Sequence, residues 1–392
     1  NSVSLLEYKL ANGIQKILTD ASPVIMICEG HGELARDQTA DLEKTLRQFY
    51  TVGHLNLDSV VQVKEDVKIL LIAKPRTTFS DQQKFKLDQY IMGGGKVVWM
   101  IDRLTAGLDS MRVTGDFVPT DYPLNIEDQL FTYGARINPN LVLDLECSKI
   151  PLRVGEQGQA AQLQLFDWFY NPIVASKSKH PIVKSLDRVN LMFPSSIDTI
   201  RTKTPVKKTI LLQTSTHARL QFAPVRLNFE ILRYDPDPLK FDKKDLPMAV
   251  LLEGTFTSHY KDRVPQAMLD GLEKMNIPFK EKSAPTKMVV VADGDIAASS
   301  LDPQGAIRPI GYNPYMKYVF ANKDFILNTI EYLLDQNGVI EARSKEVKLR
   351  PLDAQRTRDE ATFWQGLNVA LPLLILGLFA GGYLFWRKRK YA

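Results

Sequence analysis

Short apolar runs alternate along the chain with longer segments that are apolar on one side only. Five runs have the length and β-branched content of buried strands: residues 23–28, 67–73, 96–102, 248–252 and 287–292. Four segments repeat apolar residues at helical spacing: residues 37–50, 80–93, 266–275 and 322–335. Apolar strands that alternate with amphipathic helices indicate a parallel sheet covered on both faces. We therefore predict an α/β fold with a mostly parallel sheet flanked by helices.

The remaining segments of the body differ in character. Residues 2–18 carry leucine and isoleucine at helical spacing, so we expect a helix within residues 1–20 that leads into a domain over 21–335. Residues 150–240 are less regular and richer in β-branched side chains, which predicts an insertion with strands of its own. Residues 336–360 are highly charged and indicate a stalk.

A strongly apolar segment stands near the end of the sequence. No charged residue interrupts it from Ala361 to Trp386, and a helix needs about 20 apolar residues to cross a bilayer core. Trp364 and Trp386 stand near its ends, and aromatic rings prefer the two membrane interfaces. We predict a transmembrane helix over 361–386 and a basic tail over 387–392, with the lipid bilayer as a partner.

The tail sets the expected orientation. Its basic residues follow the predicted span directly and are Arg387, Lys388, Arg389 and Lys390. Positive charge beside a span favours a cytoplasmic C-terminus, which places the main domain on the other side, in the periplasm of a bacterium with two membranes. The same residues are suited to binding anionic lipid headgroups, and both uses can hold together.

Charge and cysteine content exclude some classes of function. The chain has 392 residues and a formal net charge of +5. Four of these positive charges are in the tail, so the body is nearly neutral and lacks the basic face of a nucleic-acid-binding protein. Cys28 and Cys147 are too few for a CxxC…CxxC zinc site. Cys28 ends an apolar run, which indicates a buried thiol, with a disulfide to Cys147 as the alternative.

The sequence begins with Asn1 and shows no signal-peptide pattern. We therefore expect the chain to be a processed product or part of a longer protein.

The stretch Gly30–Glu33 (GHGE) carries the first candidate chemistry. His31 and Glu33 stand directly after a predicted strand, where open α/β sheets place their ligand sites. One interpretation is a general acid/base pair or half of a metal site. The other is a glycine-permitted turn in which both side chains hydrogen-bond neighbouring loops.

Acidic residues follow two other predicted strands. Asp293 and Asp295 form a DxD pattern that suits an aspartate nucleophile with its general acid, a weak cation site, or a turn with aspartate caps. Asp102 stands where a glutamine-amidotransferase-type enzyme would carry its cysteine nucleophile, which excludes acyl transfer by the thiol route.

Two further features have simple structural interpretations. The glycines at 93–95 precede a strand, so they indicate a helix end and not a phosphate loop. The aromatic run over 166–170 is either a stacking platform or part of a core.

Several stretches occur in a recognisable order: LEYKLANGIQKIL, GHGEL, FSDQQKFKLDQYIMGGGKVVWMID, AVLLEGTFTS, VVVADGD and EARSKEVKLRPLD. With them the chain resembles, over nearly its whole length, the gliding-motility-associated ABC transporter auxiliary family of Bacteroidetes called GldG. The resemblance implies an inner-membrane protein that works with an ABC permease and a cytoplasmic ATPase. It also implies a domain similar to the glutamine-amidotransferase fold without its catalytic residues. Family members usually carry a further N-terminal membrane helix and another extracytoplasmic domain, which agrees with an upstream part outside this chain.

We therefore expect a non-catalytic, membrane-anchored transporter subunit without a metal or cofactor. Its candidates for binding a ligand are His31, Glu33, Asp102, Asp293 and Asp295. One alternative is a membrane-anchored, metal-dependent hydrolase that uses the His31/Glu33 turn. Another is a structural stalk or envelope-tethering module without a ligand.

Overall fold

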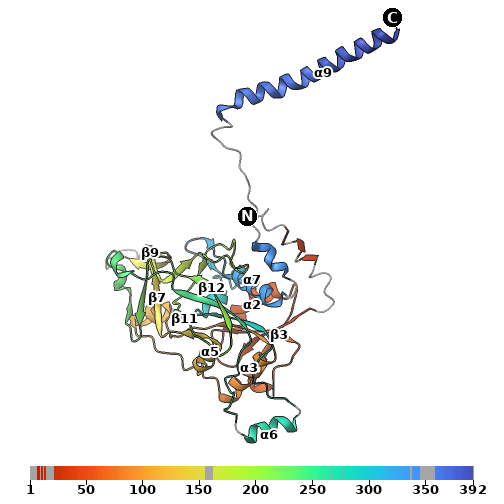
Figure 1. Cartoon of the computed structure of the whole chain (residues 1–392). Helices are drawn as coiled ribbons and strands as arrows, with labels where there is room; N and C mark the ends of the chain where they lie inside the picture. The colour runs from red at the N-terminus through yellow and green to blue at the C-terminus, as the bar shows by residue number, and fades with distance from the viewer. Residues whose placement is uncertain are drawn as a thin grey trace. The chain divides into compact units, whose positions relative to one another are not determined.

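The computed structural model describes residues 7–8, 10–11, 13–14, 22–154, 162–264, 266–275, 277–335, 338–344 and 358–391. The chain divides into two compact units, residues 1–345 and 346–392 (Figure 1). The larger unit is built around a seven-stranded sheet, and the smaller unit contains one long helix.

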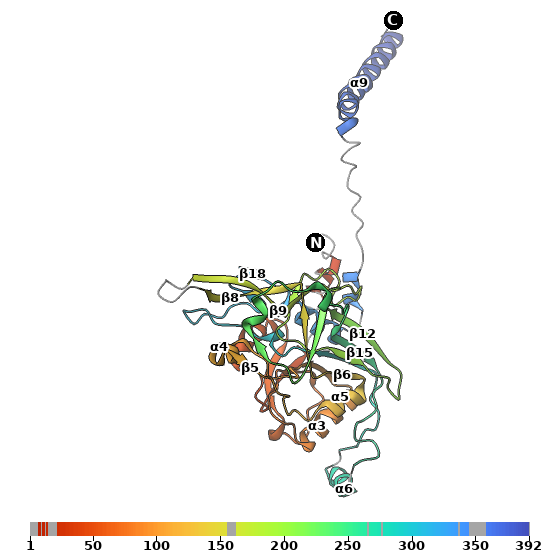
Figure 2. The ribbon, with the colours of Figure 1, turned by 90° about the vertical axis from the view of Figure 1, so that its left-hand side faces the viewer.

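The central sheet is mostly parallel (Figures 1 and 2). Five neighbouring strands run parallel, and two further strands extend the sheet through antiparallel pairings. In spatial order the strands are β12 (Val206–Gln213), β15 (Pro247–Gly254), β16 (Thr286–Val291), β4 (Lys96–Met100), β3 (Val67–Ala73), β1 (Val24–Glu29) and β2 (Thr51–Asn56). The predicted mixed α/β class is confirmed.

The winding of the sheet reverses at β1. This strand pairs with β2 on one side and with β3 on the other, and the chain visits β2 before it returns to β3. In open α/β sheets, ligand sites form beyond the carboxyl ends of the strands near such a reversal. The carboxyl ends of β1, β3, β4 and β16 therefore form the edge at which a site is expected.

Helices cover both faces of the sheet because successive strand side chains point to opposite sides. Ile69 and Leu71 belong to one core, and Leu70 and Ile72 belong to the other. The first core includes side chains of α2 (Arg36–Leu46) and α7 (Asn322–Leu334), and the second includes side chains of α3 (Asp81–Met92) and α5 (Glu127–Tyr133). Ser80 caps α3 as predicted, since its side chain accepts a hydrogen bond from the Gln83 amide.

The chain between β4 and β15 forms an elaborated region with a third core (Figure 2). Its elements other than α5 and β12 are α4 (Leu108–Thr114), β5 (Asp116–Phe117), β6 (Ala135–Ile137), β7 (Asn140–Asp144), β8 (Cys147–Val154), β9 (Gln162–Val174), β10 (Val189–Asn190), β11 (Ile197–Thr199), β13 (Ala218–Phe222), β14 (Leu227–Asn228), η2 (Phe229–Leu232) and η3 (Pro238–Lys240). Trp168, Phe169 and Tyr170 are buried in that core. The aromatic run therefore packs the interior and does not form an exposed platform. The strands predicted for 150–240 are present, and one of them, β12, joins the central sheet.

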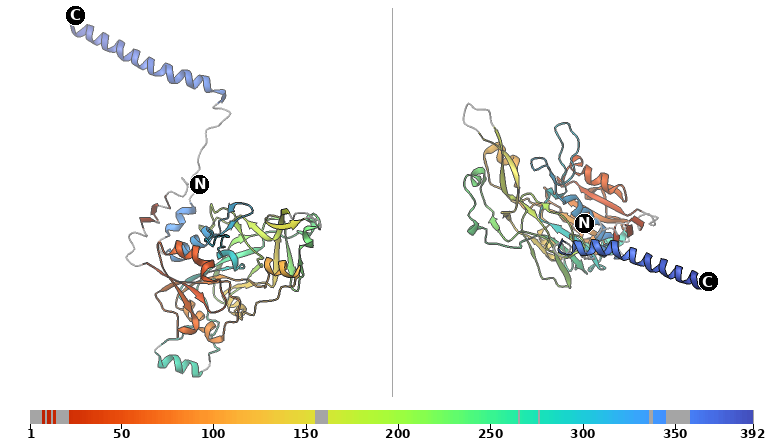
Figure 3. Two further views of the ribbon diagram at one scale, coloured as in Figure 1. Left: turned by 180° about the vertical axis from the view of Figure 1, so that it is seen from behind. Right: turned by 90° about the horizontal axis from the view of Figure 1, so that it is seen from above.

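Short elements complete the larger unit, and helix α6 stands apart from the sheet (Figures 1 and 3). These elements are η1 (Leu57–Ser59), α6 (Gln266–Lys274), η4 (Asp295–Ala297), β17 (Tyr312–Asn313), β18 (Tyr318–Val319) and η5 (Val339–Ser344). In the predicted N-terminal helix, residues 7–8, 10–11 and 13–14 are helical, and the rest of that prediction lies outside the described residues. Residues 345–357 of the predicted stalk also lie outside them.

The smaller unit contains α9 (Ala361–Tyr391), which holds the whole predicted span. Among the described residues it is the one helix that is long and apolar enough to cross a membrane. The helix continues through the four basic residues of the tail, and Lys390 Nζ lies 4.8 Å from the centre of the Trp386 ring.

Candidate functional site

Polar residues follow four parallel strands at one edge of the sheet. Gly30–Glu33 comes directly after β1, and Lys74 comes directly after β3. Asp102 follows β4 and Asp293 follows β16, each after one further apolar residue. Because these strands are parallel, all four groups lie at the edge where α/β sheets place ligand sites.

Lys74 lies among the carboxyl groups at this edge. Its ammonium nitrogen is 3.1 Å from Asp102 Oδ2 and also forms an ion pair with Asp295. Lys74 is 9% exposed and has a left-handed backbone with φ 56°. Its amide donates to the Met100 carbonyl at 2.8 Å, which fixes the loop after β3 against β4. We call Lys74, Asp102, Asp293 and Asp295 the strand-end cluster.

Backbone amides hold the two most buried carboxyl groups of the strand-end cluster. The Gly294 amide donates to Asp102 Oδ1 at 2.6 Å. The amides of Met192 and Asp295 donate to the two oxygens of Asp293, each at 2.8 Å. Met192 belongs to the elaborated region, so Asp293 ties that region to the end of β16.

The pKa values of the cluster follow from burial and from the single lysine. Burial and then the Asp295 charge raise the pKa of Asp102 to about 6, against the opposing effect of Lys74. Burial and the two neighbouring aspartates raise the pKa of Asp293 well above its usual range. Burial disfavours the charged Lys74, but Asp102 and Asp295 outweigh it and raise the lysine pKa. These directions favour a charged Lys74 beside a protonated Asp293.

His31 and Glu33 form a second, separate pair. His31 Nδ1 lies 3.2 Å from Glu33 Oε1, and the His31 amide donates to Glu33 Oε2 at 2.6 Å. The imidazole stacks on the Phe79 ring with centroids 3.7 Å apart, and both members of the pair are buried. Gly30 and Gly32 have φ values of 118° and 70°, which L side chains rarely adopt. The stretch is therefore a glycine-shaped turn closed by its own ion pair.

Burial changes the titration of this turn and of the nearby thiol. Burial lowers the pKa of His31, but the hydrogen bond to Glu33 and the nearby Gln83 side chain outweigh it and raise this pKa above its usual value. Burial and then the Glu33 charge raise the pKa of Cys28, so its thiol stays protonated and is a poor nucleophile. Cys28 and Cys147 are both free thiols, so the alternative of a disulfide between them is wrong.

Among the residues that the structure describes, two groups have donor sets that could hold a metal ion: Cys28 with His31 and Glu33, and Asp102 with Asp293 and Asp295. Within each group the ligand atoms lie within 4.8 Å of one another. In the acidic group Lys74 already supplies the positive charge. In the other group Glu33 is bound to both the ring and the amide of His31. A metal ion would have to displace these partners. Both groups are therefore arranged as ion pairs within the protein.

The structure brings three of the five predicted ligand candidates together and leaves the other two as their own pair. Sequence reasoning missed Lys74, although it follows a predicted strand just as Asp102 does. It also missed the Met192 amide, and no pattern in the sequence signals that contact. The predicted anchor residues Trp364 and Trp386 lie on α9, with the basic tail.

The sheet, its reversal at β1 and the ion-paired strand ends define an α/β domain of the doubly wound kind. The family described as "ABC-type uncharacterized transport system" matches residues 22–329, and the chain belongs to this family of ABC transporter auxiliary proteins.

Two similar proteins extend this comparison. An uncharacterized protein of Borreliella burgdorferi is 22% identical over 271 residues, which are 67% of this chain and 51% of that protein. The chain thus spans about half the length of this curated relative. A solved structure described as the mmIFT52 N-terminal domain covers 80% of this chain and 98% of its own, with 13% identity and a TM-score of 0.43.

Proposed function

We propose that the chain is a non-catalytic subunit of an ABC transport system, anchored by α9 in a bacterial inner membrane. The family match over residues 22–329 carries this proposal. The length and apolar character of α9 support the anchor. The basic tail supports a cytoplasmic C-terminus, with the α/β unit in the periplasm.

The chemistry at the strand ends supports a non-catalytic role. A hydrolase of this architecture needs an activated nucleophile or a metal-bound water at that edge. Here Lys74 is paired with two carboxylates, and the Cys28 thiol is buried and protonated. In the amidotransferase-like fold that we propose, Asp102 would take the place of the cysteine nucleophile. We propose that the domain is a glutamine-amidotransferase-like fold used for binding a ligand or partner proteins.

The partners that we propose are an ABC permease and a cytoplasmic ATPase, in a complex linked to gliding motility. Purification of the full-length protein from its native membrane in a mild detergent tests this directly. A matched control replaces α9 by an unrelated single span that keeps the four basic residues. We expect the wild type to retain both partners and the control to lose them. Recovery of the wild-type chain without either partner would contradict the proposal.

A further inference from the structure

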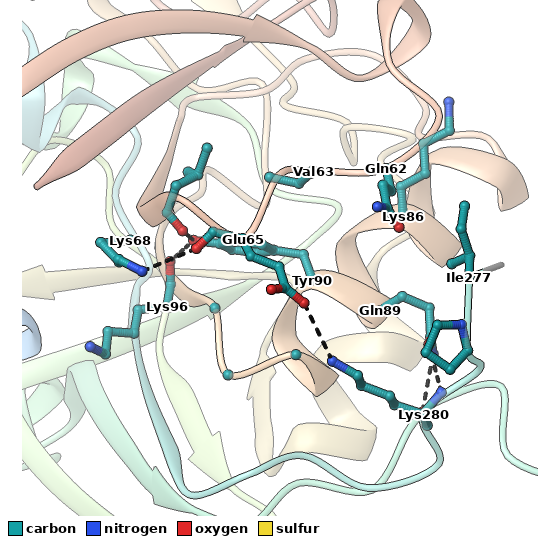
Figure 4. Close-up of a pocket in the computed structure, with 15 residues that line it drawn as sticks. Gln62, Val63, Glu65, Lys68, Lys86, Gln89, Tyr90, Lys96, Ile277 and Lys280 are labelled. Atoms are coloured by element: carbon teal, nitrogen blue, oxygen red, sulfur yellow. Dashed lines mark hydrogen bonds and ion pairs between the residues drawn. The ribbon is translucent and has the colours of Figure 1, made fainter. Parts of the chain in front are cut away.

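A pocket of about 470 Å³ lies at the amino ends of the parallel strands, beside the C-terminal half of α3 (Figure 4). Its lysines do not converge on one point. Lys280 lies 4.0 Å from Glu65, which is its ion-pair partner. Lys96 alternates along β4 with Val97 of the second core, so its side chain points to the opposite face of the sheet. The charge around this pocket is therefore divided between the two faces of the sheet.

The outer edge of the same sheet at β2 offers a different kind of binding surface. β2 pairs with β1 over six consecutive residues without a register shift, and among the described residues no strand pairs with its other side. The Thr51 amide donates to the Pro23 carbonyl at 3.1 Å, on the side of β1. Because backbone groups alternate in direction along a strand, Val52 and His54 direct their amide and carbonyl groups away from β1. These groups form a row of donors and acceptors along the edge.

The two edges of the sheet are built differently. The opposite edge strand, β12, carries Lys207 and Lys208, and its pairing with β15 shifts register at two places. Lysines and irregular pairing on an edge strand discourage the addition of a strand from another chain. The sequence of β2 is TVGHLN, without lysine or proline, and its pairing with β1 is regular. β2 therefore lacks the protection that β12 has, as expected of a strand that pairs with another chain.

The side chains of β2 leave its backbone accessible. Val52 is buried in the first core and Leu55 in the second. The ring of His54 is held between two carboxylates, with Nδ1 2.8 Å from Glu29 Oε1 and Nε2 3.2 Å from Glu43 Oε1. Glu29 ends β1 and Glu43 belongs to α2, so the imidazole is turned toward the sheet and its covering helix. The edge therefore presents mainly backbone.

We propose that β2 pairs in antiparallel fashion with β2 of a second copy of this chain, about a two-fold axis that passes beside Gly53. In this register Val52 of each copy lies opposite His54 of the other, and the outward amide and carbonyl groups of these residues bond to one another. Gly53 lies opposite Gly53 of the second copy at a closely spaced position without hydrogen bonds, where no side chain stands on the axis. Thr51 lies opposite Leu55 of the second copy.

A second copy suits this edge because it brings an equally open strand of the same length. β2 contains no Asp, Glu, Lys or Arg, so this register opposes no like charges. Phe49 precedes the strand and Val61 follows it, and they are 47% and 63% exposed. They supply apolar surface at both ends of the paired strands, beyond the backbone hydrogen bonds. A self-complementary patch of this kind gives a closed two-fold dimer, the commonest form of assembly.

Sedimentation velocity of the full chain in a non-ionic detergent tests the proposal. We expect a reversible dimer whose dissociation constant rises about tenfold or more in Thr51→Lys, because the new ammonium group would lie opposite Leu55 of the second copy. Thr51 is exposed, so the single chain tolerates this change. Thr199→Lys makes the same change at an exposed residue of β11 and should dimerise as the wild type does.

Cross-linking tests the register and separates this interface from contacts made by α9. In the proposed dimer the two Thr51 residues are offset by four residues along the strands, about 13 Å. In a Cys147→Ser background, where the remaining Cys28 is buried, a short bismaleimide should join two copies of Thr51→Cys. Thr199→Cys in the same background is the matched control and should not be joined.

Three results would overturn the proposal. The first is a wild type that sediments as a monomer, which is also the result if β2 receives a strand from a different protein. The second is a Thr51→Lys variant that dimerises as tightly as Thr199→Lys, as a dimer held by α9 alone would. The third is cross-linking of Thr51→Cys that does not exceed that of Thr199→Cys.

Discussion

Lys74 Nζ lies 3.1 Å from Asp102 Oδ2, and this ion pair joins the ends of two neighbouring parallel strands. The pair occupies the edge at which enzymes of this architecture hold substrate groups. Both side chains are almost fully buried. The interaction therefore joins the ends of β3 and β4 at this edge of the sheet.

Replacing Lys74 should destabilise the larger unit strongly. Lys74→Met leaves two carboxylates without their cation, and a broken buried ion pair costs about 3 kcal/mol. We expect the free energy of unfolding to fall by this amount at neutral pH. Urea titrations followed by the fluorescence of the buried Trp99 and Trp168 measure it. Lys44→Met, at an exposed position on α2, should shift it by less than about 0.5 kcal/mol. Equal stability of the two variants would refute the importance of the pair.

The raised pKa of Asp102 predicts a specific pH dependence. The folded-state pKa of about 6 lies above the ordinary value of 3.8, so the folded state binds this proton more tightly. The proton on Asp102 therefore stabilises the folded state in full below pH 3.8. This stabilisation is lost as the pH rises through about 6. Within this range the free energy of unfolding changes by at most about 1.4 kcal/mol per pH unit because of Asp102.

Asp102→Asn removes that contribution while it retains an oxygen that can accept from Gly294. We expect the wild type to lose more unfolding free energy than the variant as the pH rises through this window. Parallel pH profiles of wild type and variant would show that Asp102 does not titrate in this way.

Gly294 is required because the chain passes directly over Lys74. A Cβ at this position would lie 2.7 Å from the Lys74 Cβ and 3.0 Å from its Cα. Gly294→Ala should therefore lower the free energy of unfolding by about 2 kcal/mol. Gly271→Ala in α6 is the matched control, because nothing lies within 4 Å of its Cβ position, and alanine should stabilise that helix slightly. A thermal unfolding midpoint unchanged by Gly294→Ala would contradict the close approach.

The His31–Glu33 pair should stabilise the turn over a limited pH range. The pKa of Glu33 is lowered from 4.5 by its bonds to His31 against the effect of burial, so its contribution is lost as the pH falls through the folded-state value. The pKa of His31 is raised from 6.5, so its contribution is lost as the pH rises through the folded-state value. Glu33→Gln should therefore cost about 2 kcal/mol between these limits and less in alkaline solution. Denaturant titrations of wild type and variant at several pH values measure this difference in unfolding free energy. If the difference were greatest in alkaline solution, the His31–Glu33 ion pair would not be its cause.

Lys74 also predicts how the acidic cluster responds to metal ions. In the wild type its ammonium competes with any cation for Asp102 and Asp295. Lys74→Ala should allow the three carboxyl groups to bind Mn²⁺ or Ca²⁺, and a thermal shift with added metal should appear in the variant and be much smaller in the wild type. A large shift in the wild type would show that the Lys74 ammonium does not exclude cations from the acidic cluster.

The sequence predicted those parts of the fold that depend on local pattern. Strand 67–73 and the helix capped by Ser80 were found because their burial and capping are encoded within a few neighbouring residues. The pairing of Lys74 with Asp102 could not be read in this way, because it depends on the spatial order of β3 and β4. The contact between Met192 and Asp293 spans 101 residues and requires the elaborated region to be folded over the strand ends. Asp102 and Asp295 were identified as site candidates from position alone, and the lysine that pairs with both of them was overlooked.

The most direct test of the central claim is the molar recovery of partners with the full-length protein from its native membrane. The account predicts that an ABC permease and its ATPase copurify in fixed ratio with the wild type. It also predicts that variants of the strand-end cluster that remain folded, such as Asp102→Asn, retain them. Recovery of the wild type alone, under conditions that keep other inner-membrane complexes intact, would contradict the account.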